Sequence, residues 1–235
     1  MSWLQLVTIF LQHVWFVTDN AAGLELGYVF GPSPGRIMTT RTFLGFVFTE
    51  ADMASTDRRL SADEFRETRA LFQKNVVEPA TGGRKSTKVS RLERAHYFVQ
   101  AARVASHVPV KIANYCTALE ALFTNETSEL THKLSERVAW FIGIDTDERV
   151  DVFQRMKKAY GIRSKVVHGS TDWGKDTHVA SETSQFLDSL LRTVFRRIHA
   201  DPTLEDLFAG DTEPLKRKHE EYLLGLVLGN TPPSV

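Results

Sequence analysis

Apolar residues recur every three or four positions from Ser61 to near the end of the chain, the period of helices with one buried face. Ser61 and Glu64 have the spacing of a capping box, and Gly161 is predicted to end a helix. The pattern therefore predicts a mainly helical protein, with a loop at 79–87. The predicted helices are 61–77, 88–106, 109–124, 128–142, 145–160, 162–168, 177–199 and 213–228, and a further turn starts at 201–202.

Residues 1–17 are predicted to form a helix with a broad apolar face, which is either buried or docked on a partner. Leu4, Val7, Leu11 and Val14 follow helical spacing. The segment lacks the basic start and cleavage site of a secretory signal, and it is short and interrupted by polar residues. No membrane association is therefore expected.

Two extended segments follow, at 24–30 and 37–49, both rich in β-branched and aromatic residues. The Gly- and Pro-rich stretch 31–35 separates them and predicts a hairpin turn. The expected organisation is an N-terminal extension at 1–107 with a helix, a β-hairpin and basic helices, a helical domain at 108–200 and a C-terminal helical tail at 201–235.

The overall composition adds little to this picture, but the charges are distributed unevenly along the chain. The 235 residues are 42% hydrophobic and 25% charged, and the formal net charge is zero. Segment 58–105, however, carries eleven Lys and Arg against five Asp and Glu, while 1–57 and 201–235 are net acidic. The basic segment is either a local site for a polyanion or an ordinary solvated helix face.

Several kinds of chemistry are excluded by missing residues. The single cysteine, Cys116, rules out an intramolecular disulfide and a multi-cysteine zinc site, and it favours a cytoplasmic location. It belongs to the apolar stripe predicted for helix 109–124, with Ile112, Tyr115, Leu119, Leu122 and Phe123, so a buried thiol is predicted. Glycine-rich nucleotide loops, His-Glu-x-x-His and Gly-x-Ser-x-Gly are all absent. No metal and no cofactor are therefore expected.

Arg163 and His168 lie five positions apart between Gly161 and Gly169. Five steps of an unbroken helix rotate about 140°, so the two side chains share a face only if the helix starts near Arg163. A two-fold dimer can also bring both segments to one cleft. Histidine exchanges protons near neutral pH and arginine binds phosphate, a pairing suited to RNA cleavage without metal. The alternative is a surface arginine and a histidine at a helix end.

Three segments occur in an order that resembles a known family: YCTALEALF at 115–123, LTHKLSERVA at 130–139 and YGIRSKVVHG at 160–169. This combination resembles the HEPN superfamily, specifically the ApeA-like group of bacterial anti-phage proteins, over about 108–200. The stretch LQHVWFVTDN at 11–20 also resembles that group. The resemblance implies a HEPN-type helical bundle that forms a homodimer and cleaves single-stranded RNA without metal.

By position, the resemblance implies that Arg163 and His168 are the catalytic pair. Ser164 stands where many such nucleases have Asn, Asp or His, and it can still donate to phosphate. Glu120 matches a recurrent acidic position and either orients Arg163 or His168 or is an ordinary helix charge. Arg137 matches a recurrent arginine, for which a structural salt bridge is favoured over an RNA contact.

This chain differs from part of the family at a position that controls activity. Relatives restrained by a nucleotidyltransferase antitoxin carry a tyrosine two positions after the histidine, where this chain has Ser170. That mechanism is not expected, and any sensor or antitoxin partner is unidentified. Alternatives to a nuclease are a non-catalytic HEPN module for dimerisation or RNA binding in a larger defence system, and an unrelated helical scaffold.

RNA contacts are expected from basic side chains, with aromatic side chains as stacking surfaces. The candidate basic residues are Lys165, Arg91, Arg94 and Lys88, with Arg66, Arg69, Lys74, Arg84 and Lys85. The candidate aromatic residues are Tyr97, Phe98 and Trp173, although helix spacing favours core packing for Phe98.

Overall fold

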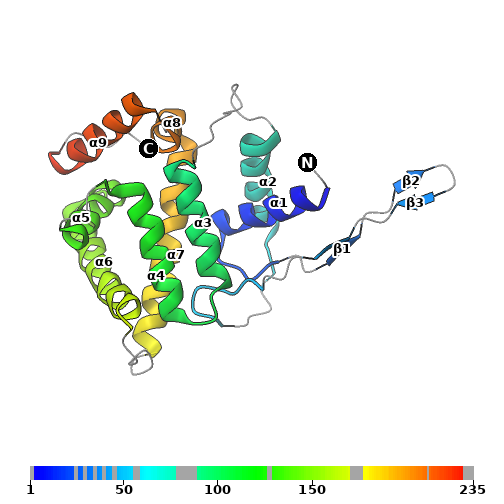
Figure 1. The fold of residues 1–235 in the computed structure, drawn as a ribbon, viewed down its shortest axis with the longest axis horizontal. Coiled ribbons are helices and arrows are strands. Elements are labelled where there is room, and N and C mark those ends of the chain that lie inside the picture. Colours follow the sequence, from blue (N-terminus) through cyan, green and yellow to red (C-terminus); the bar gives the residue numbers. More distant parts are fainter. Residues whose placement is uncertain are drawn as a thin grey trace. The chain divides into compact units, whose positions relative to one another are not determined.

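The computed structural model describes residues 3–23, 26–28, 31–33, 36–38, 41–43, 47–54, 59–77, 89–125, 129–169, 177–210 and 212–229. Helices dominate this part of the chain, as predicted (Figure 1). The helices are α1 (Trp3–Val17), α2 (Ala62–Phe72), the π-helical turn η1 (Gln73–Val77), α3 (Arg91–Val104), α4 (Val108–Phe123), α5 (Leu130–Ile142), α6 (Thr146–Val167), α7 (Thr177–Ala200), α8 (Pro202–Ala209) and α9 (Glu213–Val227).

The chain divides into two compact units. The first comprises 1–50 and 54–84, and the second comprises 51–53 and 85–235. The division falls earlier along the chain than the predicted boundary between 107 and 108, because α3 packs along α4 inside the second unit (Figure 1).

In the first unit, α1 packs against α2 through aromatic side chains. The Phe10 ring lies 5.7 Å from the Phe65 ring and 5.5 Å from the Phe72 ring. The predicted capping box at the start of α2 is confirmed: the Ser61 hydroxyl accepts from the Glu64 amide at 3.2 Å, and Glu64 accepts from the Ser61 amide at 2.8 Å.

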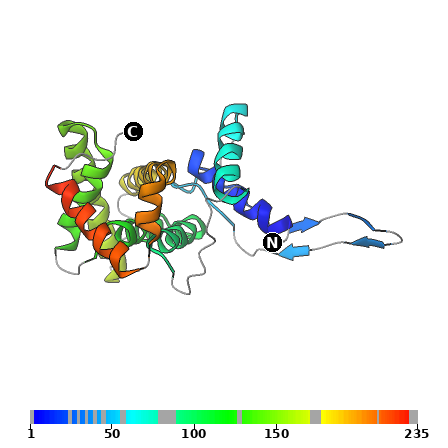
Figure 2. The same ribbon diagram turned by 90° about the horizontal axis from the view of Figure 1, so that it is seen from above.

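The hairpin predicted from 24–30 and 37–49 is not supported at that length. Within the described residues the strands have three residues each: β1 (Leu26–Tyr28) pairs antiparallel with β4 (Arg41–Phe43), and β2 (Gly31–Ser33) with β3 (Arg36–Met38) (Figure 2). Gly31–Ser33 therefore pairs where the turn was expected. Pro32 donates no backbone hydrogen bond, so pairing there is weak.

The core of the second unit surrounds α4, which packs against α3, α6 and α7. Its predicted apolar stripe is confirmed, because every member of that stripe has no exposed surface. These residues are Ile112, Tyr115, Cys116, Leu119, Leu122 and Phe123. Phe208 of α8 extends the core, since its ring lies 5.7 Å from the Phe123 ring.

Helix α6 runs without interruption from Thr146 to Val167, so the predicted break at Gly161 is wrong. Gly161 is exposed and no atom lies within 4 Å of where its Cβ would be. A glycine inside a helix costs only about 1 kcal/mol relative to alanine. Burial of Met156, Ala159 and Tyr160 on the same helix offsets that cost.

The second unit ends in two helices. The turn predicted at 201–202 begins a full helix, α8, capped by the Asp201 carboxylate, which accepts from the Thr203 amide at 2.8 Å. Helix α9 lies close to its predicted range. Among the described residues, no helix combines the length and apolar character that crossing a membrane requires.

Candidate functional site

Helices α4 and α6 bring two of the predicted site residues together. Arg163 Nη2 lies 3.2 Å from Glu120 Oε1 and 3.3 Å from Oε2. The exposed fractions of the two side chains are 22% for Arg163 and 15% for Glu120, so the pair is largely shielded from water. Glu120 is therefore not an ordinary exposed helix charge: it orients Arg163.

Two further side chains surround this ion pair, and neither was a predicted site residue. The Arg163 guanidinium lies 5.1 Å from the centre of the Tyr160 ring. Burial, and then the negative charge of Glu120, raise the pKa of Tyr160 to about 12. Burial also raises the pKa of the Cys116 thiol, as does Glu120. Both groups are neutral at physiological pH. Cys116 has no exposed surface, so it is a buried core thiol, as predicted.

His168 stands at the C-terminal end of α6 and is exposed. Its backbone N–H donates to the Ser164 carbonyl at 3.0 Å, and the Ser164 side chain is half-buried. Because α6 is continuous, the positions of Arg163 and His168 differ by about 140° around the helix. One chain therefore does not bring these two side chains to a common face.

The predicted RNA-binding residues are distributed over several elements. Arg91 Nη1 donates to the Thr124 carbonyl at 3.1 Å, and burial and the neighbouring Arg94 lower the pKa of Arg91. Arg94 is exposed on α3, and Lys165 is exposed in the last turn of α6. Lys88 lies outside the described residues.

The basic candidates are divided between the two units. Arg66, Arg69 and Lys74 belong to the first unit, whereas Arg91 and Arg94 belong to the second. Tyr97 is exposed on α3, and its ring meets the half-buried Phe98 ring edge-on at 5.5 Å. The candidates Arg84, Lys85 and Trp173 lie outside the described residues. Ser170, the position where some relatives have a tyrosine, also lies outside them.

Arg137 makes a structural contact at the end of α4. Its Nη1 donates to the Phe123 carbonyl at 2.9 Å, beside the carbonyl of Thr124 that Arg91 binds. The last carbonyls of a helix lack partners within it, so these two arginines complete the C-terminus of α4.

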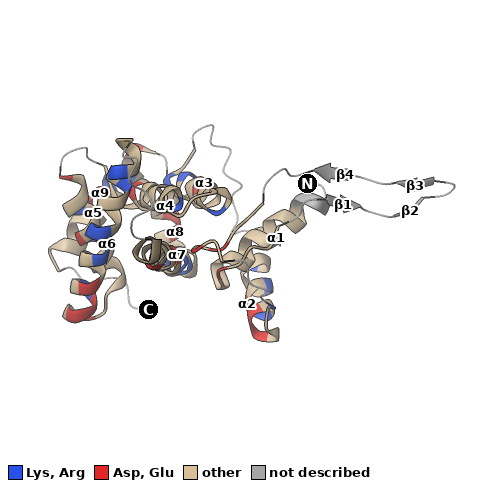
Figure 3. Cartoon of the chain, turned by 90° about the horizontal axis from the view of Figure 1, so that it is seen from below, with Lys and Arg blue, Asp and Glu red and all other residues tan. Residues whose placement is uncertain are grey.

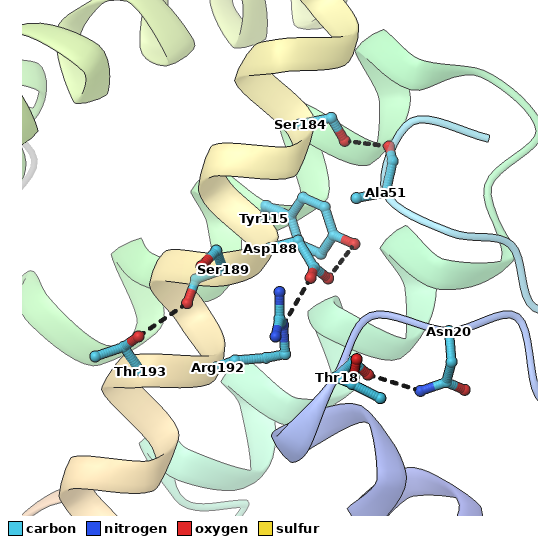
Figure 4. Close-up of polar contacts among 9 residues, drawn as sticks. All are labelled: Thr18, Asn20, Ala51, Tyr115, Ser184, Asp188, Ser189, Arg192 and Thr193. Atoms are coloured by element: carbon cyan, nitrogen blue, oxygen red, sulfur yellow. Dashed lines mark hydrogen bonds and ion pairs between the residues drawn. The ribbon is translucent and has the colours of Figure 1, made fainter. Parts of the chain in front are cut away.

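A buried polar network that was not predicted joins α4 to α7 (Figure 4). The Tyr115 hydroxyl donates to Asp188 Oδ1 at 3.1 Å, and Arg192 Nε donates to Oδ2 at 2.9 Å. The Asp188 side chain is 1% exposed. The sequence holds one signal for it, because Asp188 interrupts the apolar stripe of α7 next to Leu187. A carboxylate in such a stripe needs a buried partner.

In the described residues, no group of three or more His, Cys, Asp or Glu side chains is placed to hold a metal ion. Comparison of the chain with protein-family models, with curated proteins and with solved structures finds no match.

Proposed function

We propose that this chain is a HEPN-type endoribonuclease that cleaves single-stranded RNA without metal, as a homodimer in the cytoplasm, in anti-phage defence or toxin action. The observation that carries the proposal is the ion pair between Glu120 and Arg163. It fixes the guanidinium of the motif arginine on the same helix that ends in an exposed His168.

The proposed chemistry divides the work between these two residues. His168 accepts the proton of a ribose 2′-hydroxyl, and the 2′-oxygen attacks the adjacent phosphorus. The bond to the 5′-oxygen breaks, and that oxygen takes up a proton from solvent water. The products are a 2′,3′-cyclic phosphate and a 5′-hydroxyl. Arg163 stabilises the charge that develops on the phosphate oxygens, and Ser164 is an additional donor.

A dimer resolves the separation of Arg163 and His168 around α6. Two copies related by a two-fold axis place the same segment of each chain at one cleft, so the groups on one phosphate come from both protomers. Because each protomer by itself keeps the two side chains on different faces, the proposed activity depends on dimer formation.

The same separation favours a second candidate, a non-catalytic HEPN module that dimerises or binds RNA in a larger defence system. Arg163 is engaged by Glu120, and Ser164 replaces the more common motif residues. Such a module binds RNA without cleaving it.

The test compares the purified wild type with His168→Ala on single-stranded RNA in EDTA, with the product ends analysed chemically. We expect 2′,3′-cyclic phosphate and 5′-hydroxyl ends from the wild type, and a loss of about 10²-fold or more in the variant. His178→Ala is the matched control, because His178 is an exposed histidine on α7. RNA that is bound but intact supports the non-catalytic module instead.

A further inference from the structure

A surface pocket of about 490 Å³ lies between α6 and α7. Small-ligand sites generally have this size. Arg155 and Lys158 form its α6 side, one helical turn apart, and Phe186 and Ser189 belong to its α7 side. Basic residues also lie elsewhere along α6 (Figure 3). None of the residues that line the pocket belongs to the Arg163 and His168 motif.

A stacked pair of side chains stands in this pocket. The Arg155 guanidinium lies 3.8 Å from the centre of the half-buried Phe186 ring. About half of the Arg155 side chain stays exposed, so the guanidinium is held against the ring without being enclosed. Nucleobases stack on guanidinium planes, and the partly exposed Arg155 side chain offers such a plane, held in place by the Phe186 ring beneath it.

The charge of the pocket suits one phosphodiester. Arg155, Lys158 and Glu182 line it and give a net charge of +1. Among the described residues Lys158 has no ion-pair partner, whereas Arg155 lies 3.5 Å from Asp151. Glu182 opposes the entry of a highly charged polyphosphate. The Lys158 ammonium is therefore the group that meets the phosphate.

We propose that the pocket between α6 and α7 binds one nucleotide of a single-stranded RNA chain, with the base stacked on Arg155 and the phosphate on Lys158. The Ser189 hydroxyl is placed to contact the sugar or base edge. The site rests on the proposed function only in taking RNA as its ligand. It binds RNA whether or not the chain is cleaved, so it positions substrate in a nuclease and recognises RNA in a non-catalytic module.

The test measures binding of a short fluorescein-labelled oligoadenylate by anisotropy, in EDTA, with His168→Ala as the background so that cleavage does not interfere. Arg155→Gln should weaken binding about tenfold through loss of stacking. Lys158→Gln should weaken binding and lower the salt slope by about 0.7. Lys157→Gln is the matched control, since it removes the same charge from an exposed residue of α6 that does not line the pocket and lies about 100° around the helix from Lys158, and it should change affinity about twofold at most.

Competition with three unlabelled compounds shows whether the pocket recognises an RNA chain, a free nucleotide or phosphate alone. Unlabelled oligoadenylate should displace the probe at far lower concentration than adenosine monophosphate or inorganic polyphosphate. Equal potency of the free nucleotide overturns the assignment to an RNA chain, and equal potency of polyphosphate overturns the stacking role of Arg155. Equal weakening by Lys157→Gln and Lys158→Gln overturns the pocket itself. Binding that depends on Lys158, together with a wild type that leaves the same RNA intact, upholds the pocket and refutes the nuclease.

Discussion

Arg163 of α6 donates from Nη2 to Glu120 Oε2 of α4 at 3.3 Å, and the same nitrogen lies 3.2 Å from Oε1. The two residues are 43 positions apart in the chain. Their contact makes the proposed phosphate-binding group part of the junction between α4 and α6. The stability of the folded protein and any activity that depends on Arg163 are therefore coupled.

Glu120→Gln should lower both properties. Loss of the carboxylate leaves the Arg163 charge poorly compensated in a largely shielded position, which should cost about 2 kcal/mol in the free energy of unfolding. The midpoint of urea unfolding measures this cost. Glu221→Gln, in an exposed pair with Arg217, is the control and should cost about 0.5 kcal/mol or less. Equal effects of the two variants would show that the Glu120 contact adds nothing.

The buried network of Tyr115, Asp188 and Arg192 should be among the most sensitive positions of the second unit. Asp188→Asn removes the buried carboxylate charge that accepts from Tyr115 and Arg192 and should cost about 3 kcal/mol or more. Tyr115→Phe removes one donor and should cost about 1.5 kcal/mol. A double-mutant cycle in urea should give a coupling energy above about 0.5 kcal/mol. Strict additivity would argue against the hydrogen bond between Tyr115 and Asp188.

Stability should fall with acid because of His219. Burial, and then the positive charge of Arg91, lower the pKa of His219 to about 3 in the folded chain, below its ordinary value of 6.5. Between these values the unfolded chain binds the proton and the folded chain does not. The stability is therefore complete above pH 6.5 and declines as pH falls towards 3, by about 2 kcal/mol between pH 6.5 and 5.

The pH dependence can be assigned by substitution. Unfolding midpoints of the wild type and His219→Leu should converge or cross as pH falls from 7 to 5, because the variant lacks the group that the unfolded state protonates. His178→Gln, which replaces an exposed histidine of α7, is the control variant. An unchanged slope in His219→Leu would contradict the assignment.

Gly161→Ala should stabilise the protein by about 0.5–1 kcal/mol, because α6 is continuous and the new methyl group meets no atom within 4 Å. Gly143→Ala should do the opposite, since its Cβ would lie 2.6 Å from Arg149 Cγ and 2.9 Å from the Arg149 backbone nitrogen. Thermal unfolding of the two variants gives the comparison. Destabilisation by Gly161→Ala would mean that α6 breaks at this residue.

Some features of the second unit could be predicted from the sequence and others could not, for physical reasons. The buried stripe of α4 was predictable because it depends only on the spacing of apolar residues within one segment, from Ile112 to Phe123. The continuity of α6 was not, because the small cost of one glycine is outweighed by packing against other helices. The Glu120–Arg163 contact was suggested only by resemblance. Asp188 was missed because its partner Tyr115 lies 73 positions away.

The segment Ala51–Met53 has a consequence for how the chain can be cut. The Ser184 hydroxyl donates to the Ala51 carbonyl at 2.5 Å (Figure 4). Gln185 Nε2 donates to Asp52 Oδ2 at 2.7 Å. The polypeptide thus enters the second unit, leaves it for 54–84 and returns. A fragment that begins at residue 85 loses both acceptors and leaves the buried Ser184 hydroxyl without one of its partners. A fragment in which a short linker joins 51–53 to residue 85 keeps both acceptors. Isolating the second unit therefore requires replacing 54–84 with such a linker, whereas a single cut before residue 85 removes both acceptors.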